Sequence, residues 1–564
     1  MTFQRDTGSN LQDICRLFSQ KFASVFSSET ISPEAVSRAA SNVPQSQRSL
    51  FDIAIDEANI ETAISKLKPS TSAGPDGIPS IILKRCNNSI LEPLCHIFRL
   101  SLTTGVFPAL WKDAFIFPVH KKGDKRNIDN YRGISALCAV AKLFEMVVLD
   151  PVFFHYKHQI SDDQHGFMPK RSTSSNLLAF TSYITDGLAQ GTQTDAIYTD
   201  LTAAFDKINH DIAVAKLERY GISGSLLTWF RCYLSGRKLT VNIGTHTSES
   251  FPAISGIPQG SHLGPLVFLL YFNDVFTLLE GPSLAFADDL KLYYSIKGVI
   301  DASFLQHQLT TFGSWCKMNC LTLNINKCAV ITFTRSRHPV ITNYILGGHP
   351  IARVDQMNDL GVVLDSKLSY SLHTSYVVDK ASRNLGFIFR MTKHFKNLQC
   401  LKSLYCSLVR SVLEYASVVW SPFYRNGIDR IEAVQRRFIR FALRRLPWRN
   451  PWQLPSYESR CSLLGIDTLS VRRDVAKAVF VADIFATRID CSNLLGQIRL
   501  LARSRSSRNS TLLYLPPRRT NYASNSSING LLRHFNRLSS VFDFDVSRET
   551  LKLRFLAACR RPVV

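Results

Sequence analysis

The sequence predicts an α+β protein with several domains. The chain has 564 residues, more than one compact core normally holds, and 45% of them are hydrophobic, enough to bury more than one core. Short β-prone runs surround a pair of adjacent acidic residues between positions 195 and 294. Apolar residues recur at helical spacing between positions 401 and 445. Strand-rich and helix-rich segments thus follow one another along the chain, as in α+β proteins.

The N-terminal part alternates helical patterns with turns. Residues 1–60 form an extension in which residues 11–27 have helical spacing. No pattern there indicates chemistry, so we interpret the extension as the remnant of a linker. Residues 91–102 predict an amphipathic helix, and residues 111–119 predict a strand.

A basic turn follows that strand at residues 121–126. Lys121 and Lys122 in this turn would reach the phosphates of a nucleotide if the turn lay beside a metal site. If it does not, they are ordinary solvated lysines.

Three acidic residues stand at the ends of predicted strands. Asp200 follows the β-prone run of residues 195–199, and Asp288 and Asp289 lie at the tip of a hairpin between residues 283 and 294. Crowded carboxylates are costly unless a cation neutralises them, and a hard cation such as Mg²⁺ takes oxygen ligands. The three residues therefore predict a site for two Mg²⁺ ions and nucleotidyl-transfer chemistry. Taken alone, a surface turn with two aspartates is common in proteins without any such function.

Helices and a glycine-bearing loop separate the two acidic segments. Asn209 predicts the N-cap of a helix that ends near Tyr220. Residues 256–260 predict a loop that allows close approach of a sugar-phosphate, and Ser261 is expected to cap the next helix. The most apolar run, residues 266–272, predicts a buried helix, because a membrane span requires about 18 or more such residues.

The last quarter of the chain is strongly basic. The whole chain carries a net charge of +23, and residues 425–564 hold 24 arginines and 2 lysines against 10 acidic residues. A protein this basic usually binds a polyanion, and arginine suits contacts with phosphate. Residues 428–445 predict a helix with arginines between its apolar positions, residues 503–527 a flexible basic linker, and residues 542–558 a final helix.

The cysteines and the first residues favour an intracellular protein. The 13 cysteines show no regular pairs, and the chain starts on a polar stretch without a secretory signal. Both features are typical of a reduced protein inside the cell. We expect no membrane partner, because no stretch reaches about 18 uninterrupted apolar residues.

Eight short blocks carry a family pattern between about residues 60 and 445. They are SAGPDGIP at 72–79, PVHKKGD at 118–124, NYRGIS at 130–135, QHGF at 164–167, DLTAAFD at 200–206, SGIPQGS at 255–261, FADD at 286–289 and LNINKC at 323–328. In this order they resemble the reverse transcriptases of non-LTR retrotransposons, the LINE-like elements of the jockey type.

The resemblance implies a right-hand polymerase with fingers, a palm built on an antiparallel sheet and a helical thumb. The implied segments are an N-terminal extension at 1–60, fingers at 61–185, palm at 186–345, thumb at 346–450 and a basic C-terminal region at 451–564. Proteins of this family normally carry an endonuclease ahead of the polymerase. Because 60 residues cannot contain one, we expect this chain to lack it and to be unable to nick DNA.

The resemblance also implies an RNA-directed DNA polymerase that binds an RNA template, a DNA primer and deoxynucleoside triphosphates. Asp200, Asp288 and Asp289 are its implied ligands for two Mg²⁺ ions. Lys327 is implied to protonate pyrophosphate or is a surface lysine, and Phe205 is implied to exclude a 2′-hydroxyl or is a core aromatic. The residues implied to contact nucleotide or template are Lys121, Lys122, Arg132, Gln259 and Gly260. The implied location is the nucleus or a cytoplasmic ribonucleoprotein, and the oligomeric state is open.

Two alternatives remain. The chain could be a non-catalytic nucleic-acid-binding remnant of such an element, because residues 168–171 replace the family's usual Arg-x-Gly-Arg and His262 replaces an apolar residue. It could also be an RNA-templated RNA polymerase or a group II intron maturase, which share the palm and the acid pair. The blocks at 72–79, 118–124 and 130–135 favour the LINE-like class.

Overall fold

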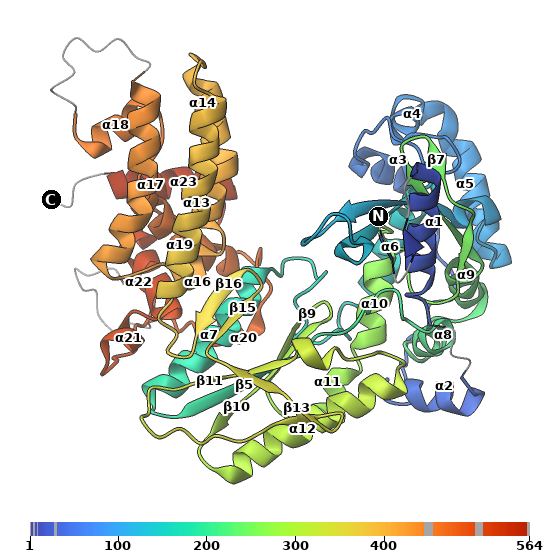
Figure 1. Cartoon of the computed structure of the whole chain (residues 1–564), viewed down its shortest axis with the longest axis horizontal. Coiled ribbons are helices and arrows are strands. Elements are labelled where there is room, and N and C mark those ends of the chain that lie inside the picture. The colour runs from blue at the N-terminus through green and yellow to red at the C-terminus, as the bar shows by residue number, and fades with distance from the viewer. Residues whose placement is uncertain are drawn as a thin grey trace.

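The computed structural model describes residues 2–3, 6–7, 10–27, 31–444, 455–501 and 511–560. A central sheet joins an N-terminal body to a C-terminal body of helices, and these two bodies lie on opposite sides of the molecule (Figure 1). Among the residues in these ranges, we find no helix that is long and apolar enough to cross a membrane.

The central sheet has the strand order β14-β11-β5-β10-β9. Its strands are β14 (Ala352–Val354), β11 (Ala329–Phe333), β5 (Gln193–Tyr198), β10 (Asp289–Ile296) and β9 (Ser283–Phe286). Neighbouring strands are antiparallel except for β14 beside β11. The strand predicted before Asp200 and the hairpin predicted between residues 283 and 294 are therefore both present, side by side.

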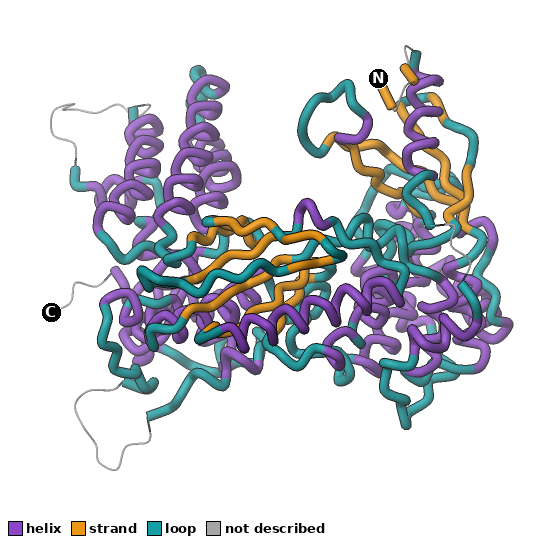
Figure 2. The backbone as a smooth tube through the Cα atoms, turned by 60° about the horizontal axis from the view of Figure 1, so that its bottom comes forward, coloured by secondary structure: helices purple, strands orange, loops and turns teal. Residues whose placement is uncertain are grey.

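Both faces of the central sheet are covered. Helix α12 (Val299–Met318) lies along one face of the sheet (Figure 2). Its buried residues belong to a core that includes Ile197 of β5. Helix α7 (Thr173–Ala189) packs on the other face, in a second core that includes Ala196. Adjacent residues of β5 thus face different cores, as the two-residue period of a strand requires.

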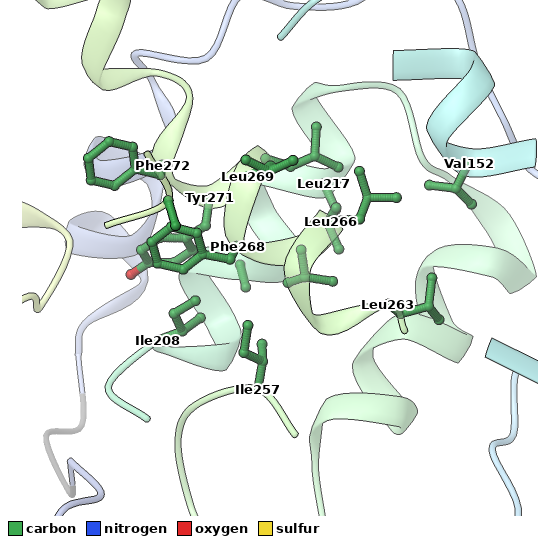
Figure 3. Packing of buried hydrophobic residues seen from close by; sticks show 14 of the residues in the cluster. Val152, Ile208, Leu217, Ile257, Leu263, Leu266, Phe268, Leu269, Tyr271 and Phe272 are labelled. Atoms are coloured by element: carbon green, nitrogen blue, oxygen red, sulfur yellow. The ribbon is translucent and has the colours of Figure 1, made fainter. Parts of the chain in front are cut away.

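Helix α10 (Gly264–Phe272) is the buried helix that the apolar run predicts. Each of its residues from Leu266 to Phe272 is at most 3% exposed, and Phe268 and Leu266 pack among side chains of neighbouring elements such as Ile257 (Figure 3). A helix that is apolar on all sides is expected to be buried in this way. Ser261 was predicted to cap this helix, but the N-cap residue is Leu263, which makes no side-chain cap hydrogen bond. Ser261 lies two residues earlier, and its hydroxyl accepts a hydrogen bond from the N–H of Gly264, the first helical residue, at 2.8 Å.

The N-terminal body is built on a second sheet with the order β4-β3-β6-β7, in which β8 also pairs with β6. Its strands are β4 (Tyr131–Leu137), β3 (Asp113–His120), β6 (Arg237–Ile243), β7 (His246–Thr247) and β8 (Phe251–Ala253). Residues 237–253, which the sequence analysis assigned to the palm segment, belong to this sheet because β6 runs parallel to β3. That pairing joins segments more than 100 residues apart and leaves no local signal.

Helix α1 (Leu11–Ala23) lies against the second sheet. Its Phe18 and Phe22 are buried in a core with Ile116 and Val241 of the sheet. The predicted helix is present, but it is a packed part of the N-terminal body and not the remnant of a linker. The pattern missed this because an amphipathic helix does not reveal which surface it covers.

Further helices complete the two bodies. Those of the N-terminal body are α2 (Pro33–Ala40), α3 (Glu57–Lys66), α4 (Ser80–Arg85), α5 (Asn87–Thr104), α6 (Ala139–Tyr156), α8 (His210–Arg219) and α9 (Gly224–Leu234). Those of the C-terminal body are α13 (Ser371–Met391), α14 (Leu398–Tyr405), α16 (Ser417–Trp420), α17 (Arg425–Leu443), α18 (Tyr457–Leu463), α19 (Leu469–Phe485), α21 (Asn521–Ser524), α22 (Ser527–Leu538) and α23 (Arg548–Arg560). The hairpin of β15 (Gln356–Asp359) and β16 (Val362–Asp365) precedes α13.

The helices of the C-terminal body share one core with α7 and the central sheet. The flexible linker predicted at residues 503–527 falls partly outside the described residues, at 503–510. Its described part is packed: Leu513 is 1% exposed, and Arg518 forms an ion pair with Asp186 of α7 at 2.9 Å. The composition of this segment predicts a flexible linker, but the buried Leu513 and the ion pair of Arg518 attach it to the C-terminal body.

Candidate active site

The tip of the β9–β10 hairpin, residues 286–289, carries the two adjacent aspartates and is called the acidic turn below. Its bend is made at Ala287, which has a φ of +59°. This left-handed conformation is unfavourable for a residue with a Cβ atom. The turn is therefore expected to depend on contacts from outside the hairpin.

Those contacts come from Gln164, a residue that sequence reasoning placed only within a family block. Its Oε1 accepts hydrogen bonds from the N–H groups of Ala287 at 3.0 Å and Gly166 at 2.8 Å, and its Nε2 donates to the Ala287 carbonyl at 3.1 Å. Both backbone polar groups of the strained residue are thus held by one buried side chain. A Cβ atom at Gly166 would lie 2.1 Å from the Ala287 nitrogen, so glycine is required at that position.

Asp200 follows β5 and lies beside the acidic turn. Its carbonyl accepts a hydrogen bond from the Asn324 N–H at 2.8 Å. Its Oδ2 accepts one from Lys327 Nζ at 3.1 Å, and the side chains of this pair are 30% and 60% exposed, respectively. The structure thus brings together two of the predicted site residues that are 127 positions apart.

The three carboxylates influence one another. Burial and the charge of Asp200 raise the pKa of Asp288. Burial of the Asp289 carboxyl group, together with the charges of Asp288 and Asp200, raises the pKa of Asp289 to about 6. Other parts of this residue are open to solvent, so the residue as a whole is exposed. Like charges that disfavour ionisation in this way create a place where a cation is favourable.

The oxygen donors of these residues suit a hard cation such as Mg²⁺. Among the described residues, however, no three His, Cys, Asp or Glu side chains are grouped closely enough to hold a metal ion. The carboxylates of Asp200, Asp288 and Asp289 are neighbours without converging, and Lys327 donates to one of them. Their residue types fit a divalent cation, provided that Lys327 gives way and the carboxylates draw together.

A buried ion pair lies beneath the acidic turn. Lys291 of β10 donates to Asp359 of β15 at 2.7 Å and to the Asn176 side chain of α7 at 2.7 Å. Lys291 and Asp359 are both about 3% exposed at their side chains, and burial lowers the pKa of Lys291. The pair links the strand that carries Asp289 to the β15–β16 hairpin.

A small cavity of about 210 Å³ lies against the second sheet, between α1 and the segments 203–206 and 253–259, and neither Asp200 nor the acidic turn lines it. Gln259 and Arg132 line it, together with Lys21 and Phe22 of α1. Gln259 Nε2 donates to the Asp206 carboxylate at 2.7 Å, and burial raises the pKa of Asp206 to about 6. The contribution of α1 to this cavity was not predicted.

The other predicted residues take different positions. Gly260 has a φ of +86° and lies next to the Ser135 carbonyl of β4. The ring of Phe205 stacks on Phe268 of α10 with centroids 4.5 Å apart and is partly buried, which is compatible with a gate and with a core aromatic. Lys121 and Lys122 are exposed in the turn between β3 and β4, and neither forms an ion pair with a described residue.

Comparison with known proteins adds an independent finding. Residues 119–384 match the family described as reverse transcriptase (RNA-dependent DNA polymerase). The chain is 27% identical over 404 residues to the probable RNA-directed DNA polymerase from transposon BS of Drosophila melanogaster. The aligned region covers 68% of this chain and 44% of that protein. It is 25% identical over 450 residues to the RNA-directed DNA polymerase from mobile element jockey of the same species, covering 77% of this chain and 49% of that protein.

A third relative is the probable RNA-directed DNA polymerase from transposon X-element of Drosophila melanogaster, 24% identical over 396 residues, covering 68% of this chain and 43% of that protein. The chain thus spans less than half the length of each of these curated relatives. The matched region contains the acidic turn, Asp200, Gln164 and Lys327. Residues 119–384 therefore form a reverse transcriptase domain, related to those of the jockey-type non-LTR retrotransposons.

Proposed function

We propose that the chain is an RNA-directed DNA polymerase that extends a DNA 3′ end on an RNA template. The observation that carries the proposal is the acidic turn beside Asp200, held in place by Gln164 within a reverse transcriptase domain. In this proposal the N-terminal body supplies the fingers, the central sheet the palm and the C-terminal helices the thumb of a right-hand polymerase.

The chemistry assigns a role to each residue of the site. Asp200, Asp288 and Asp289 would hold two Mg²⁺ ions. Such ions stabilise the charge on the attacking and leaving oxygens of a phosphoryl transfer. Gln164 keeps the two turn carboxylates at a fixed position, which matters because a small misplacement of a catalytic group costs much of the rate.

Lys327 and the cavity residues act on the nucleotide. Lys327 donates to Asp200 beside the acidic turn. In the proposal it gives way to the metal ions and protonates the leaving pyrophosphate as a general acid. Phe205 limits the room beside the sugar, and Arg132 contacts phosphate. Gln259, fixed by Asp206, contacts the template or the nucleotide, and Gly260 lets the backbone approach them. Lys121 and Lys122 reach the nucleotide only if the β3–β4 turn moves toward the acidic turn.

The test is extension of a DNA primer annealed to RNA, in Mg²⁺, by the chain and by its Asp288→Asn variant. We expect extension with deoxynucleotides, at least 100-fold loss of it in the variant, and unchanged binding of the primer–template. Asp545→Asn removes an exposed carboxylate of the C-terminal body and serves as the control, with full activity expected.

Three outcomes contradict the proposal in different ways. Binding without any extension identifies a non-catalytic remnant. Preference for ribonucleotides identifies an RNA polymerase. Full activity of the Asp288→Asn variant rules out the assignment of the metal ligands.

A further inference from the structure

A pocket of about 550 Å³ opens in the C-terminal body, and its residues take no part in the site described above. We call it the C-terminal pocket. It is lined by the segment after β11, the loop between β16 and α13, the start of α17, and helices α19 and α22. Its volume lies in the range of small-molecule sites and is large enough for a nucleotide unit.

The C-terminal pocket lies at the far end of the central sheet from the acidic turn. Arg335, one of its lining residues, follows the end of β11 that pairs with Thr194, whereas Asp200 follows the opposite end of β5. Six residues of extended chain separate these ends, or roughly 20 Å. A ligand in this pocket is therefore distinct from a nucleotide at the acidic turn.

The lining of the pocket has an excess of positive charge. Five of the residues that line the pocket have cationic side chains at neutral pH, and Asp474 is the one lining residue with a carboxylate. The five are Arg335, Lys367, Arg473, Lys477 and Arg533. Asp474 is already engaged by Arg537 at 3.2 Å and by His534 at 3.4 Å. None of the five cations forms an ion pair with a residue of the described ranges, although Asp474 and the more distant Glu432 and Glu414 offset part of their charge.

Two of these cations are held in unfavourable surroundings. Arg473 is 4% exposed, and its Nη1 has no hydrogen-bond partner among the described residues. Burial, together with the guanidinium groups of Arg473 and Arg533, lowers the pKa of Lys477 to about 8 in spite of the opposing effect of Asp474. Glu432, Asp474 and Glu414 oppose the effect of burial on Arg473, but its pKa is still lowered. A buried cation that is only partly compensated is costly, and an anionic ligand would offset that cost.

Aromatic rings stand beside the cations. Tyr424 is 61% exposed and Phe423 is 38% exposed, with ring centroids 4.1 Å apart, and both line the pocket. On another wall, the Arg335 guanidinium lies 4.1 Å from the ring centroid of Tyr522. Arg533 donates to the Asn525 side chain and the Ser524 carbonyl, and Arg335 donates to the Lys367 carbonyl, so these cations are fixed by neutral acceptors that leave their charge in place. Exposed rings that share a pocket with such cations suit a single strand, because its bases are free to stack while its phosphates meet the charges.

We propose that the C-terminal pocket binds a single-stranded segment of nucleic acid. A phosphate lies against Lys477 and Arg533, and a base stacks on Tyr424. A duplex would leave these rings unused, because its bases are already stacked on each other. The proposal adds a second nucleic-acid site to the chain, separate from the site of synthesis, and it holds whether or not the chain is an active polymerase.

The test measures binding of a fluorescent ten-nucleotide strand to the full chain carrying Asp288→Asn, in the presence of saturating unlabelled primer–template. The pocket variant is Tyr424→Ala with Arg533→Gln. The matched control is Phe544→Ala with Arg554→Gln, which removes an aromatic residue of almost equal exposure (62%) and an exposed arginine elsewhere in the C-terminal body. We expect the pocket variant to bind at least tenfold more weakly and the control to bind within twofold of the parent.

Lys477→Met provides a second variant that keeps the fold, because removing a disfavoured charge does not expose the core. The same weakening is expected from it. Equal affinities of the pocket variant, Lys477→Met and the control would overturn the proposal, as would displacement of the strand by inorganic phosphate or pyrophosphate alone. Strands of RNA and DNA are compared in parallel, and the strand whose affinity falls most in the pocket variant is the ligand. In the chain with Asp288 intact, extension of a short annealed primer should be unchanged by the pocket substitutions.

Discussion

The conformation of Ala287 is held by a side chain 123 positions away in the sequence. No local pattern predicts this contact, because glutamine at position 164 follows a turn and has no periodicity that would single it out. The carboxylates of Asp200, Asp288 and Asp289 could be predicted because each stands at a strand end. The side chain that positions them could be found only once the two segments were seen together.

We expect Gln164→Ala to lower kcat by about 10- to 100-fold, which corresponds to roughly 1.4–2.8 kcal/mol of transition-state stabilisation. Loss of the hydrogen bonds from Gln164 releases Ala287 from its left-handed conformation and moves the carboxylates of Asp288 and Asp289. Nucleotide binding is expected to be little affected. Steady-state kinetics of primer extension separates the two effects, and KM should change less than threefold.

Gln306→Ala is the matched control for that measurement. Gln306 of α12 makes the same two hydrogen bonds to one backbone residue, Ile345, at 2.8 and 2.7 Å, and Ile345 is not a residue of the central sheet or of the acidic turn. If both variants lower kcat equally, the effect of Gln164 is general destabilisation and not positioning.

Asp206 gives a prediction about pH. Its pKa is about 6 in the folded chain and near 3.8 when unfolded, so the folded state binds more protons between these values. Stability is therefore highest below pH 4 with respect to this group, and it falls as the pH rises to 6. Asp206→Asn should be more stable than the parent by about 3 kcal/mol at pH 7, because a pKa difference of one unit corresponds to about 1.4 kcal/mol.

Chemical denaturation at pH 7 and pH 4 measures that difference. The gain from Asp206→Asn should vanish at pH 4, because the parent is then protonated as well. The control Asp545→Asn changes an exposed carboxylate and should shift stability by less than about 0.5 kcal/mol at either pH. A gain of the same size at both pH values would contradict the assignment.

At the scale of elements, the buried pair of Lys291 and Asp359 joins β10 to the β15–β16 hairpin. We expect Lys291→Met or Asp359→Leu alone to destabilise the fold by about 3–5 kcal/mol, because each leaves a buried group without its partner. The double variant Lys291→Met with Asp359→Leu should lose much less. A double-mutant cycle by chemical denaturation gives the coupling, and strictly additive losses would show that the pair does not act as a unit.

Elements with a local signature could be predicted from the sequence. Asn209 caps α8 through hydrogen bonds to the N–H groups of Asp211 and Ile212, and the hairpin of β9 and β10 lies where its alternating residues predict it. The parallel pairing of β3 with β6 and the docking of α1 could not be predicted. Both depend on surfaces that form only when distant segments meet.

At the scale of the whole molecule, the basic C-terminal region does not form an independent unit. Its helices α19 and α22 share a core with α7, and Ala478, Val481 and Phe535 of these helices are at most 1% exposed. Removing the chain after position 425 would therefore expose apolar surface of the central sheet and of α7. Charge effects of this region have to be tested by substitution of exposed residues and not by truncation.

Helix α17 offers such a test, because three exposed arginines at its C-terminal end form one stripe. Arg437, Arg440 and Arg444 are exposed at spacings of three and four residues, whereas Val434 and Phe438 of the same helix are buried. If this stripe lies along a nucleic-acid duplex, each phosphate contact contributes about 0.9 to the slope of log affinity against log salt concentration. Changing all three arginines to glutamine should then reduce the slope by up to about 2.7 for a primer–template.

The matched control changes Arg499, Arg519 and Arg554, which are also exposed, and removes the same net charge from other surfaces of the C-terminal body. Equal reductions in the two triple variants would show that only the total charge of +23 matters and that the duplex does not follow α17.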